Sequence, residues 1–273
     1  MLIVTSVTWD LPELAERYDR ISDLQFRSGR ILTERMSIKD GDVVLDVGCG
    51  TGRLALYVAD VVGPSGSVLG LDPSPHRINV AINKLKGVAV HNVRFAVGRG
   101  EDLFGIPDNK FDHVYYSSVF HWIDDKGAAL REAARALKPG GKVGMTTVNR
   151  DFPFDMENMM EGIFSKGIYA GQAKMDEELM KLVNLAELDG LFKDAGLDHI
   201  NIDSVTETHC FPSAEELISF MEASSFGNFL RFLPERLHAD AREDIRKGLE
   251  GRRTAKGVEL ASNTIYAIAS KPL

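Results

Sequence analysis

The sequence predicts an α/β protein with a parallel sheet and helices on both faces of that sheet. Short apolar runs, typical of buried parallel strands, alternate with helical patterns as far as residue 148. The remainder is mostly helical, with two further strand-like runs. A chain of 273 residues is long enough for one or two domains. We therefore expect one sheet that carries helical additions.

The N-terminal region, residues 1–39, is predicted to form a helical lid. Apolar residues recur near helical spacing over 11–38, and Gly29 interrupts the pattern, which indicates two helices. Residues 1–9 are apolar, but no basic residue precedes them as in a signal peptide. We expect them to be an ordered terminal segment.

The central region, residues 40–150, is predicted to contain five strands and the helices between them. Ser74 can accept a hydrogen bond at the start of one helix, and Pro75 suits the first position of that helix. Lys138-Pro139-Gly140-Gly141 is expected to stop another. The strands are expected at 43–47, 67–71, 93–97, 111–117 and 142–148, and the helices at 52–62, from Ser74 onward and at 127–137.

The last region, residues 151–273, is predicted to complete the sheet and to add a helical cap. Strands are expected near 200–211 and 262–270, and cap insertions near 153–180 and 213–258. Such insertions can pack over the carboxyl ends of the strands, where open α/β sheets bind ligands.

Composition excludes several classes of protein. No apolar run approaches the ~20 residues that a membrane helix needs, so no membrane span is expected. Two cysteines, Cys49 and Cys210, cannot build a disulfide framework or a four-thiolate zinc site, and a cytoplasmic location is expected. No His/Cys/Asp cluster has metal-ligand spacing, so we predict no metal. The net charge of -8 argues against a nucleic-acid partner. Nothing in the sequence indicates an oligomeric state.

The segment Asp46-Val47-Gly48-Cys49-Gly50-Thr51-Gly52 ends the first predicted strand and opens a helix. Glycines are needed where the backbone turns tightly and approaches a ligand closely. Asp72 ends the next predicted strand, where an acidic side chain can accept hydrogen bonds from both hydroxyls of a ribose. The pattern indicates a nucleotide-like ligand.

Two ligands compete for this loop. A dinucleotide site prefers the spacing G-x-G-x-x-G, whereas the spacing here is G-x-G-x-G. The Asp46 carboxylate, two residues before the first glycine, would repel a pyrophosphate and suit an ammonium or sulfonium charge. S-adenosylmethionine (SAM) is therefore favoured. A turn that merely joins strand to helix is the alternative, and the presence of Asp72 argues against it.

These motifs resemble the class I SAM-dependent methyltransferases, in the broad group that includes ubiquinone-type C-methyltransferases. The resemblance implies a Rossmann-like sheet of seven strands with an antiparallel last strand. It implies that Asp46 and the loop with Gly48, Cys49, Gly50 and Gly52 hold the methionine part of SAM. By the same resemblance Asp72 holds the ribose, and Pro73 helps to flank the adenine. Matching segments cover about residues 40–148, at 43–52, 70–72, 93–103, 111–114 and 137–141.

One segment departs from the pattern of this group. The third strand is usually followed by Gly-Asp-Ala-Glu, whose aspartate accepts from the adenine amino group, but here the chain reads Gly98-Arg99-Gly100-Glu101-Asp102. Arg99 cannot accept a hydrogen bond. We expect Gly100, Glu101 and Asp102 to meet the adenine through a carboxylate or a backbone carbonyl; the alternative is a solvated turn.

Three further residues are assigned to the cofactor site. Tyr18 and Gln25 lie in the N-terminal helices, and in similar methyltransferases a tyrosine from such a helix closes over the SAM pocket. Ser117 ends the fourth predicted strand. Tyr18 also lies on an apolar stripe, so a packing role is its alternative.

The acceptor side begins at Ser117-Ser118-Val119-Phe120-His121-Trp122. It is not Asn-Pro-Pro-Tyr, the signature of enzymes that methylate nucleobase or amide nitrogens. The His-Trp pair resembles small-molecule carboxylate methyltransferases, such as those acting on trans-aconitate, malonyl carrier protein and juvenile hormone acid. His121 can serve as a base for a hydroxyl, because its pKa lies near neutrality, or can orient a carboxylate. The alternatives are a water-facing His121 and a core position for Trp122.

The cap segments are rich in methionine and phenylalanine, which can line an adaptable apolar pocket or form the core of the cap. Arg231, Arg252 and Arg253 are candidates to meet an anionic acceptor. The sequence thus predicts SAM-dependent methylation of a small molecule, at a carboxylate or a hydroxyl. C-methylation of a quinone-like ring is the alternative, as is a SAM-binding protein without catalysis, which the Arg99 departure keeps open.

Overall fold

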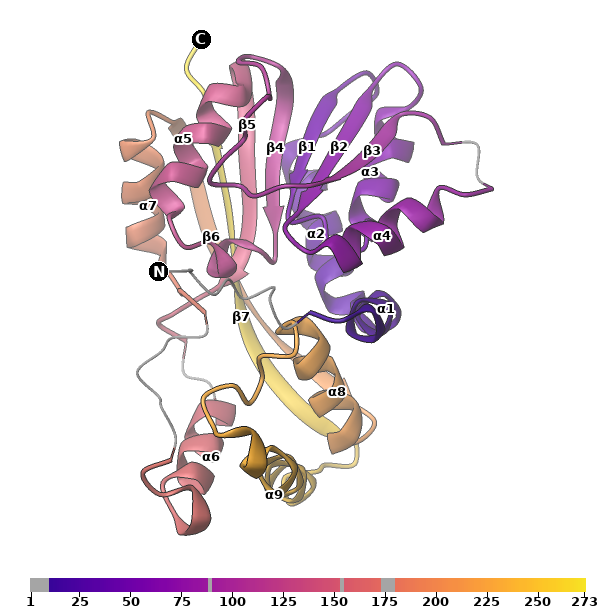
Figure 1. Ribbon diagram of the computed structural model, residues 1–273. Helices are drawn as coiled ribbons and strands as arrows, with labels where there is room; N and C mark the ends of the chain where they lie inside the picture. The colour runs from indigo at the N-terminus through magenta and orange to yellow at the C-terminus, as the bar shows by residue number, and fades with distance from the viewer. Residues whose placement is uncertain (1–9, 88–89, 153–154, 173–179) are drawn as a thin grey trace.

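The computed structural model describes residues 10–87, 90–152, 155–172 and 180–273. A twisted sheet with flanking helices forms one part, and a smaller helical part lies beyond the ends of its strands (Figure 1). The terminal segment expected at 1–9 lies outside the described residues. The strands are β1 (Val43–Val47), β2 (Ser67–Asp72), β3 (Val93–Val97), β4 (Phe111–Ser117), β5 (Leu137–Val148), β6 (Asp198–Phe211) and β7 (Val258–Ser270).

The seven strands pair in the order β3-β2-β1-β4-β5-β7-β6. The five strands from β3 to β5 run parallel, while β7 runs antiparallel to both β5 and β6. The prediction of a seven-stranded α/β sheet with an antiparallel last strand is confirmed. Because β1 and β4 are central neighbours, the loops that follow them meet at one edge of the sheet.

Helices cover both faces of the sheet because successive strand residues point to opposite sides. Tyr115 of β4 packs with α2 (Asp23–Met36) and α3 (Arg53–Val62), whereas Tyr116 packs with α5 (Lys126–Ala136) and α7 (Leu185–Asp194). Helix α4 (Pro75–Lys84) lies along β2 and β3. Ser74 caps α4 by accepting from the backbone N–H of Arg77, as predicted.

The N-terminal region does form two helices, but the break is not at Gly29. Helix α1 (Pro12–Ile21) ends at Ser22, and Gly29 lies inside α2. A Cβ atom at Gly29 would lie 2.5 Å from Cδ2 of Leu54. The glycine therefore permits close packing of α2 on α3 rather than breaking the helix.

Two strands begin earlier than expected. β5 starts at Leu137, not at Lys142, and β7 starts at Val258. The Pro139-Gly140-Gly141 stretch stays extended because Gly140 N–H donates to the Lys271 carbonyl, and Lys271 N–H donates to the Gly141 carbonyl. Pairing with the end of the chain overrides the turn signal.

The cap consists of α6 (Asp155–Phe164), α8 (Ala214–Ser224) and α9 (His238–Glu250). It has a hydrophobic core of its own, in which Met159, Leu217 and Ile245 are buried. β6 and β7 extend past the end of β5 and form one wall of the cap (Figure 1). No described helix is long and apolar enough to cross a bilayer.

Candidate functional site

The loop after β1 is shaped by three glycines with left-handed backbone. Gly48, Gly50 and Gly52 have φ angles of 77°, 54° and 79°, which side-chain-bearing residues rarely adopt. A Cβ atom at Gly48 would lie 2.3 Å from Cγ2 of Val119. The loop after β1 and the loop after β4 therefore lie in close contact at the sheet edge.

Asp72, at the end of β2, organises this edge through backbone hydrogen bonds. Its carboxylate accepts from Gly50 N–H at 2.9 Å and from Ser74 N–H at 2.8 Å. Burial raises the pKa of Asp72, and the nearby Arg77 cation opposes that rise. The side chain thus joins the loop after β1 to the loop after β2.

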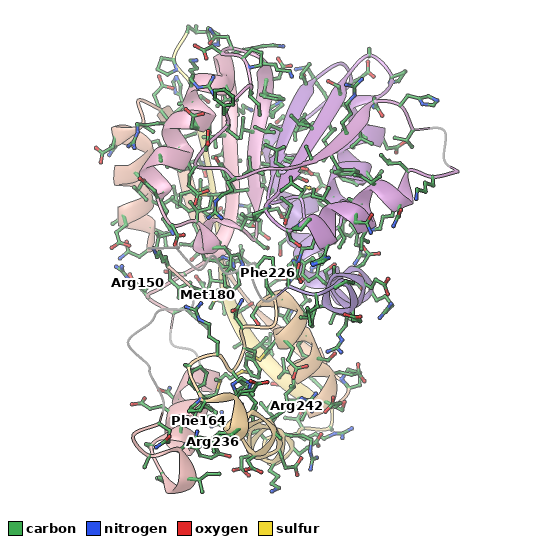
Figure 2. The ribbon with its side chains drawn as sticks, viewed as in Figure 1. Arg150, Phe164, Met180, Phe226, Arg236 and Arg242 are labelled. Carbon is green, nitrogen blue, oxygen red and sulfur yellow. The ribbon has the colours of Figure 1, made fainter. Side chains whose placement is uncertain are left out.

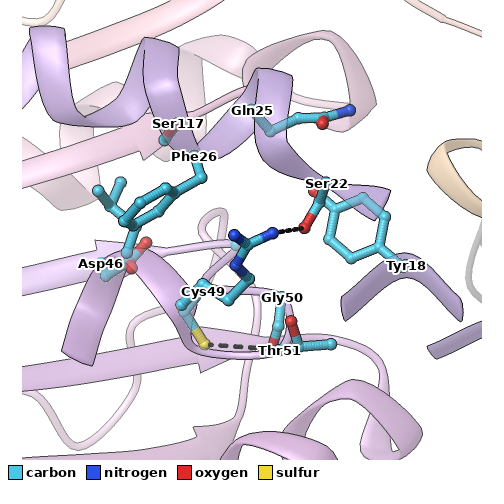
Figure 3. Close-up of a pocket in the computed structure, with 12 residues that line it drawn as sticks. Tyr18, Ser22, Gln25, Phe26, Asp46, Cys49, Gly50, Thr51 and Ser117 are labelled. Atoms are coloured by element: carbon cyan, nitrogen blue, oxygen red, sulfur yellow. Dashed lines mark hydrogen bonds between the residues drawn. The ribbon is translucent and has the colours of Figure 1, made fainter. Parts of the chain in front are cut away.

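Asp46 is also buried, and Tyr115 Oη donates to its carboxylate at 2.8 Å. Burial raises the pKa of Asp46 to about 8, although the Tyr115 hydrogen bond opposes this. A nearby cation would favour the ionised form. Asp46 and Cys49 face a small cavity of about 40 Å³, which α1 and α2 close from the other side with Tyr18, Ser22 and Gln25 (Figure 3).

The N-terminal helices are held to the glycine loop by hydrogen bonds and ion pairs. Thr51 Oγ1 donates to Asp19 at 2.6 Å, and Lys84 pairs with Asp19 while donating to the Thr51 carbonyl at 2.9 Å. Arg53 donates to Ser22 Oγ at 3.2 Å. The predicted lid is therefore docked over the loop in this structure.

A much larger cavity of about 860 Å³ runs from the glycine loop into the cap. Asp46 and Cys49 line only the small cavity, whereas Gly52 and Asp102 line neither of the two cavities. Most predicted site residues line the larger one, namely Tyr18, Gln25, Gly48, Gly50, Asp72, Pro73, Gly100, Glu101, Ser117, His121 and Trp122.

The segment after β3 directs Arg99 and Glu101, but not Asp102, toward the cavity. Asp102 is exposed and accepts from Phe104 N–H at 3.1 Å, which holds a tight turn. Glu101 accepts from Asp124 N–H at 3.2 Å. Arg99 lines the cavity and pairs with Glu101 at 3.6 Å. Gly100 and Glu101 thus reach the cavity, whereas Asp102 faces solvent.

Arg77 is a cavity residue that sequence reasoning missed. It is 3% exposed, and its Nε donates to Asp10 at 3.2 Å while its Nη2 donates to the Ala223 carbonyl at 2.9 Å. Its guanidinium carbon lies 4.2 Å from the ring centre of Tyr18 and 3.9 Å from that of Phe226. Nothing in the sequence pattern of α4 indicates this role, because the partners come from the lid and the cap.

His121 lies in the short 3-10 helix η2 (Phe120–Trp122), next to the end of β4. It is buried, with Nδ1 3.3 Å from Thr147 Oγ1, and burial lowers its pKa to about 3. The near-neutral pKa expected for this histidine is therefore wrong, because desolvation disfavours the imidazolium. Trp122 packs edge-on against Phe226, with ring centres 5.4 Å apart.

The cap end of the cavity, which we call the cap chamber, is mainly apolar. Figure 2 shows Met180 and Phe226 between the sheet and the cap. Arg231, Arg252 and Arg253 are not among the described residues that line it. Its apolar lining consists of Met156, Met160, Met180, Leu182, Phe220, Met221, Phe226, Phe229, Phe232 and Leu260.

Two polar pairs stand out on the cavity wall. His209 and Ser262 lie together on β6 and β7, inside the cap chamber. Arg150 lies at the exposed rim and pairs with Glu187 at 2.7 Å.

The described ranges of the chain contain no group of three or more His, Cys, Asp or Glu residues that could hold a metal ion.

Comparisons with known proteins identify similar chains. A family model described as a methyltransferase domain matches residues 38–213. Demethylmenaquinone methyltransferase of Geobacillus sp. (strain WCH70) is 30% identical over 211 residues, which cover 71% of this chain and 89% of that protein. A corresponding enzyme of Listeria welshimeri is 29% identical over 203 residues, 69% of this chain and 86% of that protein.

A solved structure agrees with the fold. Phosphoethanolamine N-methyltransferase 2 of Haemonchus contortus, solved with SAM, superposes with a TM-score of 0.64. It is 19% identical and covers all of this chain and 61% of its own. At that identity the likeness concerns the fold alone.

Proposed function

Because this chain belongs to the class I SAM-dependent methyltransferases, we propose that it methylates an uncharged, largely apolar small molecule. The observation that carries the proposal is the larger cavity, of about 860 Å³, which joins the glycine loop to the cap chamber. Ligand pockets usually measure about 300–1,000 Å³, so this one has room for SAM and an acceptor together.

The residues around the glycine loop fit SAM. The loop leaves a cradle at Gly50, where a Cβ atom would meet Tyr18 at 3.4 Å. Gln25 Oε1 is buried and has no hydrogen-bond partner among the described residues, so it can accept from the ligand. When bound, SAM supplies an activated methyl group on a sulfonium. In this proposal Asp46 stabilises the cationic end, Asp72 accepts from the ribose hydroxyls, and Gly100 and Glu101 flank the adenine.

His121 is proposed to position the acceptor rather than to remove a proton from it. A group with a pKa of about 3 stays neutral at pH 7 and is a weak base. The neutral ring can still form hydrogen bonds, and its Nδ1 lies 3.3 Å from Thr147 Oγ1. Methyl transfer then depends mainly on holding donor and acceptor in line.

The cap chamber favours a neutral acceptor over a carboxylate. A buried carboxylate needs a paired cation, and the predicted partners Arg231, Arg252 and Arg253 do not line the chamber within the described part of the chain. The arginines that do line the cavity are already paired, Arg77 with Asp10, Arg99 with Glu101, and Arg150 with Glu187 at the rim. Methionine and phenylalanine side chains instead suit an apolar body.

C-methylation of a quinone-like ring is the specific form of this function that we favour. Two relatives that match more than two thirds of the chain carry the name demethylmenaquinone methyltransferase. Their named substrate is a ring with little charge, which matches the apolar chamber described above.

The test is transfer of labelled methyl from SAM to three acceptors: reduced demethylmenaquinone, trans-aconitate and a long-chain fatty acid. We expect label in the quinol product and its persistence in mild base, since a C-methyl group does not hydrolyse. Base-labile label in either acid would show a carboxyl ester and contradict the neutral acceptor. Absence of transfer, in protein shown to bind SAM, would favour a non-catalytic SAM-binding protein.

A further inference from the structure

His209 and Ser262 form a hydrogen-bonded pair on the wall of the cap chamber. His209 Nε2 lies 3.1 Å from Ser262 Oγ. In the β6–β7 ladder His209 pairs with Leu260, and Ser262 pairs with Glu207, so the two side chains are diagonal neighbours on one face. Both line the cavity, beside the apolar Leu260 and Phe220.

The pair lies beyond the sheet edge that carries the glycine loop. Thr264 of β7 pairs with Val148, the last residue of β5. Ser262 lies two residues beyond Thr264, past the end of β5. Through the register of β4 and β5, Asp46 of β1 is level with Ile268 of β7, so Ser262 lies six residues, or about 20 Å along the strand, from that level. A ligand group that meets the pair is therefore held deep in the cap chamber, away from the glycine loop.

Whichever way its protons are placed, the pair has one donor to spare. A neutral imidazole carries a single N–H. If Nε2 accepts from the Ser262 hydroxyl, the N–H is on Nδ1; if Nε2–H donates to Oγ, the Ser262 hydroxyl proton is left over. Among the described residues no hydrogen bond reaches Nδ1 of His209.

Burial favours the neutral form of this imidazole. It lowers the pKa of His209, and the nearby Glu207 and Arg27 have opposing effects. Glu207 and Arg27 are themselves joined in an ion pair. The pair therefore presents a hydrogen-bond donor without a positive charge.

From this geometry we infer that His209 and Ser262 bind an uncharged carbonyl or hydroxyl oxygen of the acceptor, away from the atom that is methylated. This inference rests on the proposed function, because it assigns the substrate to the cap chamber. A single donor in an apolar wall matches one oxygen on an apolar ring. The pair would select between rings of the same shape that differ in that oxygen.

The test uses the full chain loaded with S-adenosylhomocysteine and two probes, 2-naphthol and naphthalene, titrated by calorimetry. The wild-type protein should bind 2-naphthol about fivefold more tightly than naphthalene, the value of one hydrogen bond. The double variant Ser262→Ala/His209→Phe, which removes both donors, should reduce that preference to below about twofold without weakening naphthalene binding. His209→Gln, which keeps a donor, should retain much of it.

Ser204→Ala is the matched control, because Ser204 is exposed on β6, the strand that carries His209, and does not line the cavity. It should behave as the wild type. A wild-type protein without preference for 2-naphthol would overturn the inference, and so would a preference that survives in the double variant Ser262→Ala/His209→Phe. Failure to bind S-adenosylhomocysteine would instead contradict the proposed function, so the two failures can be told apart.

Discussion

The glycine loop and the cap chamber share one cavity but are held in different ways. Around the loop, the buried Asp72 carboxylate fixes two backbone N–H groups, and positive-φ glycines remove side-chain bulk. In the cap chamber, methionine and phenylalanine side chains line the wall and few polar groups interrupt them. A ligand at the loop must match directed hydrogen bonds, whereas a ligand in the chamber must match mainly shape.

The largest effect is expected from a substitution at Arg77, which contacts both Tyr18 near the glycine loop and Phe226 in the cap chamber. Arg77→Met leaves Asp10 buried without its cation, and we expect unfolding free energy to fall by about 3–5 kcal/mol. Urea denaturation measures this. Lys193→Met, which removes an exposed pair with Asp189, should cost less than about 1 kcal/mol. The double variant Arg77→Met/Asp10→Asn should recover much of the loss; no recovery would mean that the pair is not the cause.

The loop side is tested next by Asp72→Ala. Loss of its charge-assisted hydrogen bonds should weaken SAM binding by about 1–3 kcal/mol, measured by calorimetry on protein shown to be folded. Asp60→Ala, at an exposed position of α3, is the matched control and should bind SAM normally. Unchanged affinity in the Asp72 variant would place the SAM site elsewhere.

The pH dependence of SAM binding tests the role of Asp46. Its pKa of about 8 means that the carboxyl is protonated in the ligand-free protein at neutral pH. The cation of SAM favours the ionised form, so binding should release a proton, and affinity should rise with pH up to about 8, by at most about tenfold per pH unit. Calorimetry in buffers of different ionisation heat measures the proton. Asp46→Asn should remove this contribution; a wild-type affinity independent of pH would contradict it.

The smallest effect is expected in the cap chamber. Replacing Met156, Met160 and Met221 together by leucine conserves volume, so stability should change by less than about 1.5 kcal/mol. SAM affinity should stay within about twofold, because these residues do not touch the glycine loop. The relative rates with acceptors of different shape should change, and product analysis with labelled SAM measures them. A large loss of SAM affinity would show that the two regions are not separable.

The sequence was most informative where one local pattern determines one local structure. Asp46, the glycine loop and Asp72 are identified by strand ends and spacing, and the structure brings them together. Ser74 and Pro75 mark the start of α4 correctly, because capping involves only near neighbours. The parallel sheet follows from the alternation of strands and helices.

Features that depend on distant partners could not be read from the sequence. Arg77 is buried only because Asp10, Tyr18 and Phe226 come from the lid and the cap to surround it. His121 has a low pKa because its surroundings exclude water, which no motif records. His209 and Ser262 meet because β6 and β7 run past β5, and their pairing register decides which side chains face the chamber.

The position of β7 has a consequence for the order in which the sheet assembles during synthesis. β7 is synthesised after every other strand, yet it lies between β5 and β6. Until residues 258–270 are made, β5 and β6 have no partner between them, and both present unpaired edges that can recruit other chains. The sheet and one wall of the cap are therefore completed in the same late step. We expect nascent chains that stop before residue 258 to depend on chaperones and to aggregate without them.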